Sequence, residues 1–200
     1  MTLVVVPFRQ GKSRLGSAPD DRKRLSLAML GDVLTACIAF GEALVVTADE
    51  EGARLARGLG AATAVDPGGG QGSAVAAALA SLPVEPVLVV NSDVPCVVPR
   101  DLRTLDEVAS MAALALVEAA DGTTNALGLP GPDEFAPLYG PGSARRFLEH
   151  GRARGLDAVS VALPNLSDDV DTPSDLERVG LRAGPRTQAA LAHLGRRAVA

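Results

Sequence analysis

Aromatic side chains are scarce in this 200-residue chain, which has no tryptophan, one tyrosine and four phenylalanines. Proteins that bind single-stranded nucleic acid stack bases on aromatic rings, and most nucleic-acid surfaces carry an excess of positive charge. Here aromatic residues make up 2% of the chain, and the formal net charge is −5 at pH 7. We therefore expect no nucleic-acid partner, and any basic group that binds a ligand should act locally.

Cysteine and histidine are also rare. Cys37 and Cys96 lie far apart and form no CxxC or Cys/His spacing, which predicts two reduced cysteines rather than a disulfide or a zinc site. The two histidines, His150 and His193, lie near no serine or cysteine in a nucleophile motif. This distribution argues against a histidine-dependent catalytic triad.

Hydrophobic runs are present but short. The first run, at residues 3–7, lacks the length and flanks of a signal peptide, and no stretch approaches the roughly 20 apolar residues of a membrane-spanning helix. We expect a cytoplasmic protein with no membrane partner. With 47% hydrophobic and 22% charged residues, the chain can bury one core, and we expect a single domain over residues 1–200.

Strand-like and helix-like segments alternate through the first half of the chain. The predicted strands are 3–7, 43–47, 62–65 and 87–91, and the predicted helices are 20–40, 49–58, 73–82 and 100–110. The first and fourth of these strands contain continuous apolar runs, at 4–6 and 87–90, as expected for strands buried on both faces. The pattern predicts a three-layer α/β fold with a mostly parallel, Rossmann-like sheet.

The second half is less regular. Segments 111–118 and 126–129 resemble strands joined by the turn Asp121-Gly122, which predicts a small antiparallel extension of the sheet. A further strand is predicted at 158–163, and further helices are predicted at 143–154, 174–182 and 187–197.

A basic loop follows the first strand. Lys12 and Arg14 lie where an open α/β sheet binds ligands, and two cations there suit a polyphosphate. No GxxxxGK[ST] motif is present, so the loop taken alone fits a solvated basic surface better than a phosphate site.

Carboxylates follow two later strands. Asp93 comes directly after the fourth strand, where an oxygen ligand suits Mg²⁺ held partly by phosphate. Asp169 and Asp171 have the two-residue spacing that places side chains on one face of an extended segment. Asp93 could instead sit in a turn or cap a helix, and Asp171 could cap the helix that Pro173 begins.

Two glycine-rich loops also open helices. Residues 66–73 (DPGGGQGS) and 140–145 (GPGSAR) would let a ligand approach backbone amides at a helix start, where anions are favoured. The first could otherwise be a flexible surface loop, and Ser143 could be an ordinary cap. Thr123-Thr124-Asn125 adds neutral hydrogen-bond donors beside a turn.

The order of these motifs resembles the guanylyltransferases of coenzyme F420 biosynthesis, described as 2-phospho-L-lactate or phosphoenolpyruvate guanylyltransferases. The resemblance covers about residues 3–192. It rests on the segments KSRL (12–15), AML (28–30), VTAD (46–49), NSDVP (91–95), YGPGSAR (139–145) and DVDTP (169–173). It implies a nucleotidyltransferase domain with the nucleotide-diphospho-sugar transferase-like fold.

The resemblance also implies roles for individual residues. Mg²⁺ would be held by Asp93, Asp169 and Asp171, and catalysis would involve Lys12, Arg14 and Asp93. The nucleotide would be bound by Lys12, Arg14, Gly70, Gly72 and Ser73, and the acceptor by Thr124, Gly140 and Ser143. One departure concerns Gln71-Gly72-Ser73, which stands where such proteins usually have Leu-Asn. This departure falls on the segment that would contact the base, so the sequence predicts nucleotidyl transfer and leaves the base preference open.

The resulting prediction is transfer of GMP from GTP to a small phosphorylated three-carbon acid, with release of pyrophosphate. Phosphoenolpyruvate is the first choice of acceptor, followed by 2-phospho-L-lactate and then 3-phosphoglycerate. Two alternatives are a nucleotidyltransferase acting on a pterin or sugar phosphate, and a non-catalytic nucleotide-binding regulator. The sequence leaves open whether the protein forms a homodimer.

Overall fold

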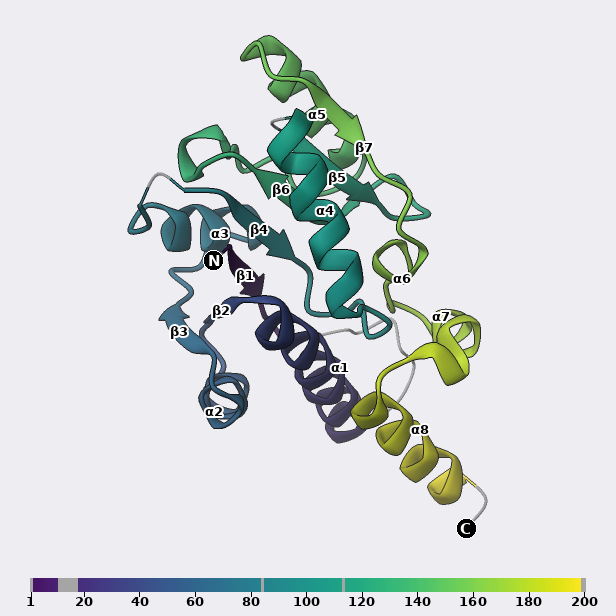
Figure 1. The fold of residues 1–200 in the computed structure, drawn as a ribbon. Helices are drawn as coiled ribbons and strands as arrows, with labels where there is room; N and C mark the ends of the chain where they lie inside the picture. The colour runs from purple at the N-terminus through teal and green to yellow at the C-terminus, as the bar shows by residue number, and fades with distance from the viewer. Residues whose placement is uncertain (1, 11–17, 84, 113, 199–200) are drawn as a thin grey trace.

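The computed structural model describes residues 2–10, 18–83, 85–112 and 114–198. Seven strands form one sheet in the order β3-β2-β1-β4-β6-β5-β7 (Figure 1). The strands are β1 (Leu3–Pro7), β2 (Glu42–Thr47), β3 (Ala62–Val65), β4 (Val87–Val90), β5 (Leu114–Glu118), β6 (Thr124–Leu129) and β7 (Ala158–Ser160). Strand β6 is antiparallel to both β4 and β5, whereas the other pairs are parallel. The mostly parallel sheet with an antiparallel piece is confirmed.

Helices cover both faces of this sheet. They are α1 (Pro19–Phe40), α2 (Glu50–Leu59), α3 (Gln71–Leu79), α4 (Pro99–Ala112), α5 (Ser143–Ala153), α6 (Pro164–Ser167), α7 (Pro173–Val179) and α8 (Pro185–Ala198), with 3₁₀ turns η2 (Pro132–Glu134) and η3 (Gly180–Arg182). In β1, Val4 and Val6 pack in a core cluster with α1 and α4, whereas Val5 packs in a second cluster with α3 and α5. Because strand side chains alternate between faces, this arrangement gives three layers.

Several element ends differ from the sequence-based prediction. Met111 was expected to begin a strand but lies in the last turn of α4, and β5 begins at Leu114. Strand β6 begins at Thr124, two residues before the predicted start at residue 126, because its first residues pair with the end of β5 after the turn. Helix α3 begins at Gln71, two residues before the predicted start, and the short helix α6 was not predicted.

The cysteine prediction agrees with the structure: Cys37 and Cys96 are both free and buried. Among the described residues, no helix is both long and apolar enough to span a bilayer.

The candidate site lies where β1, β4 and β6 meet at one edge of the sheet. β1 and β4 end there at Pro7 and Val90, and antiparallel β6 begins there at Thr124. The N–H of Asn91, just beyond β4, donates to the carbonyl of Asn125 in β6 at 2.9 Å. This pairing brings segments that are distant in the sequence to the carboxyl end of the parallel strands, where α/β folds bind ligands.

Candidate functional site

Three carboxylates gather beside this edge. Asp93 lies in the turn after β4, and Asp169 and Asp171 lie in the extended segment between α6 and α7. One oxygen from each lies within 4.8 Å of the others, and all three residues are partly buried. The structure thus brings together the three aspartates that the sequence pattern selected.

Main-chain pairing and packing join the two segments. The N–H of Val170 donates to the carbonyl of Asp93 at 3.0 Å, and the Val170 side chain is fully buried in a core cluster. Since side chains alternate along an extended segment, burying Val170 turns Asp169 and Asp171 toward Asp93. Asp168 instead pairs with Arg178 at 3.3 Å and with Arg182.

The alternative role of Asp171 as a helix cap does not apply. The N-cap of α7 is Thr172, whose hydroxyl accepts from the N–H of Asp175, and the Asp175 carboxylate accepts in return from the N–H of Thr172. Burial opposes the charge of Asp175, yet the Thr172 hydroxyl and the N–H groups of Asp171 and Thr172 lower the pKa of its carboxyl. Thr172 and Asp175 therefore supply the cap of α7, and the Asp171 carboxylate belongs to the carboxylate cluster.

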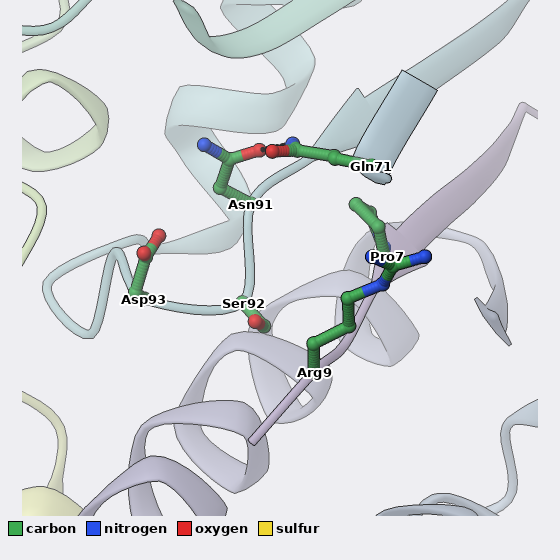
Figure 2. Close-up of a pocket in the computed structure, with 6 residues that line it drawn as sticks. All are labelled: Pro7, Arg9, Gln71, Asn91, Ser92 and Asp93. Atoms are coloured by element: carbon green, nitrogen blue, oxygen red, sulfur yellow. Dashed lines mark hydrogen bonds between the residues drawn. The ribbon is translucent and has the colours of Figure 1, made fainter. Parts of the chain in front are cut away.

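A small pocket adjoins the cluster. It has a volume of about 130 Å³ and is lined by Pro7, Arg9, Gln71, Asn91, Ser92 and Asp93. Figure 2 shows the amide ends of Gln71 and Asn91 meeting across it, with Asp93 and Arg9 on separate sides below them. The Gln71 amide donates to the Asn91 side-chain oxygen at 2.6 Å. The pocket therefore combines a carboxylate, amides and a guanidinium within reach of one ligand.

Arg9 is a residue that sequence reasoning missed. Its guanidinium donates to both oxygens of Asp66, at 2.6 and 2.9 Å, and to the carbonyl of Gly70 at 3.1 Å. The Asp66 carboxylate also accepts from the N–H of Gly68 at 2.8 Å. The Arg9 hydrogen bonds hold the pKa of Asp66 below its ordinary value, although burial opposes this. The signal available in the sequence was a cation two residues after β1 and an aspartate directly after β3.

The glycine-rich loop forms one wall of a larger pocket of about 740 Å³. Gly70, Gly72 and Ser73 line one side, and Pro137, Tyr139 and Gly140 line the other. Gly72 is needed for close packing, because a Cβ there would lie 2.8 Å from Pro137 Cβ. The structure therefore places Gly140 and three of the five predicted nucleotide residues, Gly70, Gly72 and Ser73, around the same cavity.

The other two predicted acceptor residues, Thr124 and Ser143, are not among the residues that line this pocket. The hydroxyl oxygens of Thr124 and Ser143 are 3.0 Å apart, and these residues are only 1% and 0% exposed. Ser143 does not cap α5, whose N-cap is Gly142. The acceptor role of Thr124, Gly140 and Ser143 stays a prediction.

The cation beside Gly140 is Arg146, a second residue that sequence reasoning missed. Its guanidinium donates to the carbonyls of Leu138, Tyr139 and Pro141 and so fixes the loop that precedes α5. Gly140 has φ +114°, which a residue with a side chain adopts only under strain. Lys12 and Arg14, the predicted phosphate-binding cations, lie outside the described residues.

Comparison with known proteins gives a family match over nearly the whole chain. A family model described as "Guanylyl transferase CofC like" matches residues 2–195. The chain is 37% identical to a phosphoenolpyruvate guanylyltransferase of Streptomyces scabiei, covering 97% of this chain and 96% of the relative. It is 38% identical to the enzyme of the same name from Streptomyces coelicolor, covering 96% of each.

Solved structures share the fold at lower sequence identity. A nucleotidyl transferase from Methanothermobacter superposes with a TM-score of 0.68 at 19% identity, covering 90% of this chain and 95% of the other. The 2-C-methyl-D-erythritol 4-phosphate cytidylyltransferase of Thermus thermophilus superposes with a TM-score of 0.60 at 17% identity, covering 94% and 98%. These similarities establish the nucleotidyltransferase-type fold.

Proposed function

The chain belongs to the family of CofC-like guanylyl transferases, and from this membership we propose that it transfers GMP from GTP to the phosphate of phosphoenolpyruvate in coenzyme F420 biosynthesis. The choice of acceptor rests on the relatives named phosphoenolpyruvate guanylyltransferase. We also propose that residues 1–200 act as one nucleotidyltransferase domain, since the seven strands belong to a single sheet.

The observation that carries the chemistry is the carboxylate cluster beside a pocket at the sheet edge. Hard oxygen ligands close to one another fit Mg²⁺, which proteins hold by a few carboxylates together with substrate phosphates. We propose that Asp93, Asp169 and Asp171 hold this ion, which when bound neutralises charge on the phosphate oxygens.

The proposed reaction joins two phosphates. An oxygen of the acceptor phosphate attacks the α-phosphorus of GTP, a new P–O bond forms, and the bond to the β-phosphate oxygen breaks so that pyrophosphate leaves with the electron pair. The acceptor phosphate is already ionised at neutral pH, so no strong base is required. We propose that Lys12 and Arg14 bind the GTP phosphates. The protein would then catalyse the reaction mainly by positioning the substrates and neutralising charge.

The larger pocket is the proposed site for the guanine end of GTP. Its wall includes the start of α3, where Gly72 and Ser73 present backbone amides at a helix N-terminus. A base read by buried hydrogen bonds discriminates strongly, because the wrong base leaves polar groups unpaired. We expect GTP to be preferred over ATP and CTP for this reason.

The direct test mixes the purified chain with Mg²⁺, one nucleotide and one acceptor, and follows pyrophosphate release. The acceptors are phosphoenolpyruvate, 2-phospho-L-lactate and 3-phosphoglycerate, with a reaction lacking acceptor as the control. We expect the fastest release with GTP and phosphoenolpyruvate, and mass spectrometry should detect the guanylylated product.

Other outcomes identify the alternatives. Release with a pterin or sugar phosphate, but with none of the three-carbon acids, would replace the proposed acceptor. Tight GTP binding without turnover on any acceptor would favour a non-catalytic regulator. Equal rates with GTP and CTP would contradict the proposal that hydrogen bonds in the larger pocket select guanine.

A further inference from the structure

We propose that Asn125 and Asn91 are positioning residues for Asp169 and that, through Gln71, they connect the carboxylate cluster to the start of α3. This inference rests on the proposed metal-binding role of the cluster. It is carried by a continuous chain of side-chain amides, Gln71 to Asn91 to Asn125 to Asp169, that crosses from one side of the site to the other.

The final link reaches the carboxylate itself. The Asn125 side-chain nitrogen donates to Asp169 Oδ1 at 3.3 Å and to the main-chain carbonyl of Ser167 at 3.2 Å. Asn125 is 1% exposed, so its amide is shielded from bulk water and held in one position. Asp169 thus receives a hydrogen bond from a rigid donor on one oxygen.

Two main-chain carbonyls fix the direction of the whole chain. A carbonyl only accepts, so the carbonyl of Ser167 requires the nitrogen of Asn125 to face it, which leaves Asn125 Oδ1 to accept from Asn91 Nδ2 at 3.3 Å. The carbonyl of Thr124, 3.2 Å from Asn91 Nδ2, likewise turns Asn91 Oδ1 toward Gln71. The amide of Gln71 must then donate. No member can rotate by 180° without placing like atoms opposite each other.

The sheet explains why these residues meet. Asn91 follows β4 and Asn125 is the second residue of antiparallel β6, and the Asn91 N–H bonds the Asn125 carbonyl. Gln71 is the first residue of α3, directly after the loop that Arg9 holds through Gly70 and Asp66. The amide chain therefore joins the glycine-rich loop, the sheet edge and the carboxylate segment in one network.

Such a network orients a metal ligand in advance. Partners that hydrogen-bond a ligating side chain fix its orientation, and losing one typically weakens metal binding about 10–100-fold. Asn125 should have the largest effect because it touches Asp169. Asn91 acts through Asn125, so its loss should weaken metal binding less, and loss of the Gln71 amide should weaken it least.

The test measures binding of Mn²⁺ alone, by electron paramagnetic resonance of the free ion, to the full chain without nucleotide or acceptor. The variants are Asn125→Ala, Asn91→Ala and Gln71→Met, the last of which keeps the side-chain length and removes the amide. We expect the dissociation constant to rise about 10-fold or more for Asn125→Ala and progressively less along the chain.

Asn165→Ala is the matched control. Asn165 also donates its amide to a carboxylate, that of Asp101 at 3.1 Å, but neither residue belongs to the cluster. The Asn165→Ala substitution should leave the Mn²⁺ dissociation constant unchanged. A general loss of stability would instead raise the dissociation constant in all variants alike. Thermal melting of each variant separates the two effects. If Asn125→Ala does not fold, Asn91→Ala decides the question.

An unchanged dissociation constant in a folded Asn125→Ala or Asn91→Ala protein overturns the proposal, and so does an equal change in Asn165→Ala. The result is separate from the proposed reaction. Graded loss of Mn²⁺ binding in a protein that guanylylates no acceptor would support the positioning role and reject the proposed function. Turnover of phosphoenolpyruvate by the wild-type protein, together with unaltered Mn²⁺ binding in the variants, would support the proposed function and reject the positioning role.

Discussion

At the scale of single residues, the carboxylates of the 168–171 segment differ in what each one faces. Asp169 and Asp171 face Asp93, whereas Asp168 faces Arg178 and Arg182. Burial of Val170 sets this alternation. Proximity in sequence therefore does not give these aspartates the same partners.

Asp171→Asn tests the cluster at this scale. The substitution keeps the volume of the side chain but removes one negative charge from the proposed ion site, so we expect Mn²⁺ binding and turnover to fall strongly while thermal melting stays close to wild type. Asp168→Asn is the matched control: it removes the same charge from the same segment. Asp168→Asn breaks the partly exposed ion pairs with Arg178 and Arg182, which should lower the free energy of unfolding by about 0–1 kcal/mol for each pair. Similar losses of Mn²⁺ affinity in both variants would contradict the assignment.

The sequence predicted the aspartates of the site better than its amides. A carboxylate after a strand, and two carboxylates with a spacing of two, are local patterns that an extended segment converts directly into geometry. The contact between Asn91 and Asn125 spans 34 positions and exists only because β6 inserts antiparallel beside β4. Arg9 was missed because its role depends on Asp66, which the sheet brings close to it.

At the scale of elements, the approach of α3 to the 135–139 loop determines the larger pocket. Gly72 permits the approach, since an added Cβ would lie 2.8 and 3.0 Å from Pro137 Cβ and Cα. A glycine in the first turn of α3 thus allows the helix to pack closely against Pro137.

Gly72→Ala should move α3 away from Pro137. We expect an overpacking cost of about 1–3 kcal/mol in the free energy of unfolding, measured by denaturant titration. Because Gly72 lines the proposed guanine pocket, the KM for GTP should rise as well.

Gly58→Ala is the control: Gly58 is exposed in α2 and a Cβ there meets nothing within 4 Å. It should stabilise the protein by about 0.4–1 kcal/mol without changing KM. An unaltered KM in Gly72→Ala would place the guanine base elsewhere.

The types of element were predictable, whereas several of their ends were not. Strands β1 and β3 were predicted with the same bounds that the structure has, β1 from a continuous apolar run. The end of α4 was misplaced because Met111 is apolar, which suggests a buried strand, yet it is 79% exposed on the helix. Strand ends depend on pairing with distant partners, and apolar composition alone does not specify that pairing.

At the scale of the whole molecule, the packed core also holds titratable groups: Cys37 and Cys96 belong to two different core clusters, and partly buried Tyr139 packs against a third. Cys37 of α1 is fully buried, and burial raises the pKa of its thiol to about 12. Burial also raises the pKa of Cys96, although Arg182 and Arg178 oppose the shift. Tyr139 has a raised pKa for the same reason as Cys37. The folded state therefore favours the protonated form of all three groups.

These shifts predict loss of stability at alkaline pH. A thiol whose pKa is higher in the folded state stabilises the fold fully below the unfolded value, near 8.5, and loses that contribution as pH rises toward the folded value. Between these limits one such group lowers the free energy of unfolding by about 1.4 kcal/mol per pH unit. Denaturant titrations between pH 7 and pH 10 should show this slope, with Tyr139 adding to it toward pH 10, where unfolded tyrosine begins to ionise.

Cys37→Ala assigns the slope to its source. The variant loses packing at every pH, so the slope with pH, rather than the absolute stability, is compared with wild type. We expect the decline above pH 9 to become distinctly shallower in Cys37→Ala, because the most strongly shifted thiol is gone. Cys96→Ala should retain more of the slope, since Arg182 and Arg178 favour the ionised form of Cys96. A decline in Cys37→Ala as steep as that of wild type would show that groups other than this thiol limit stability at alkaline pH.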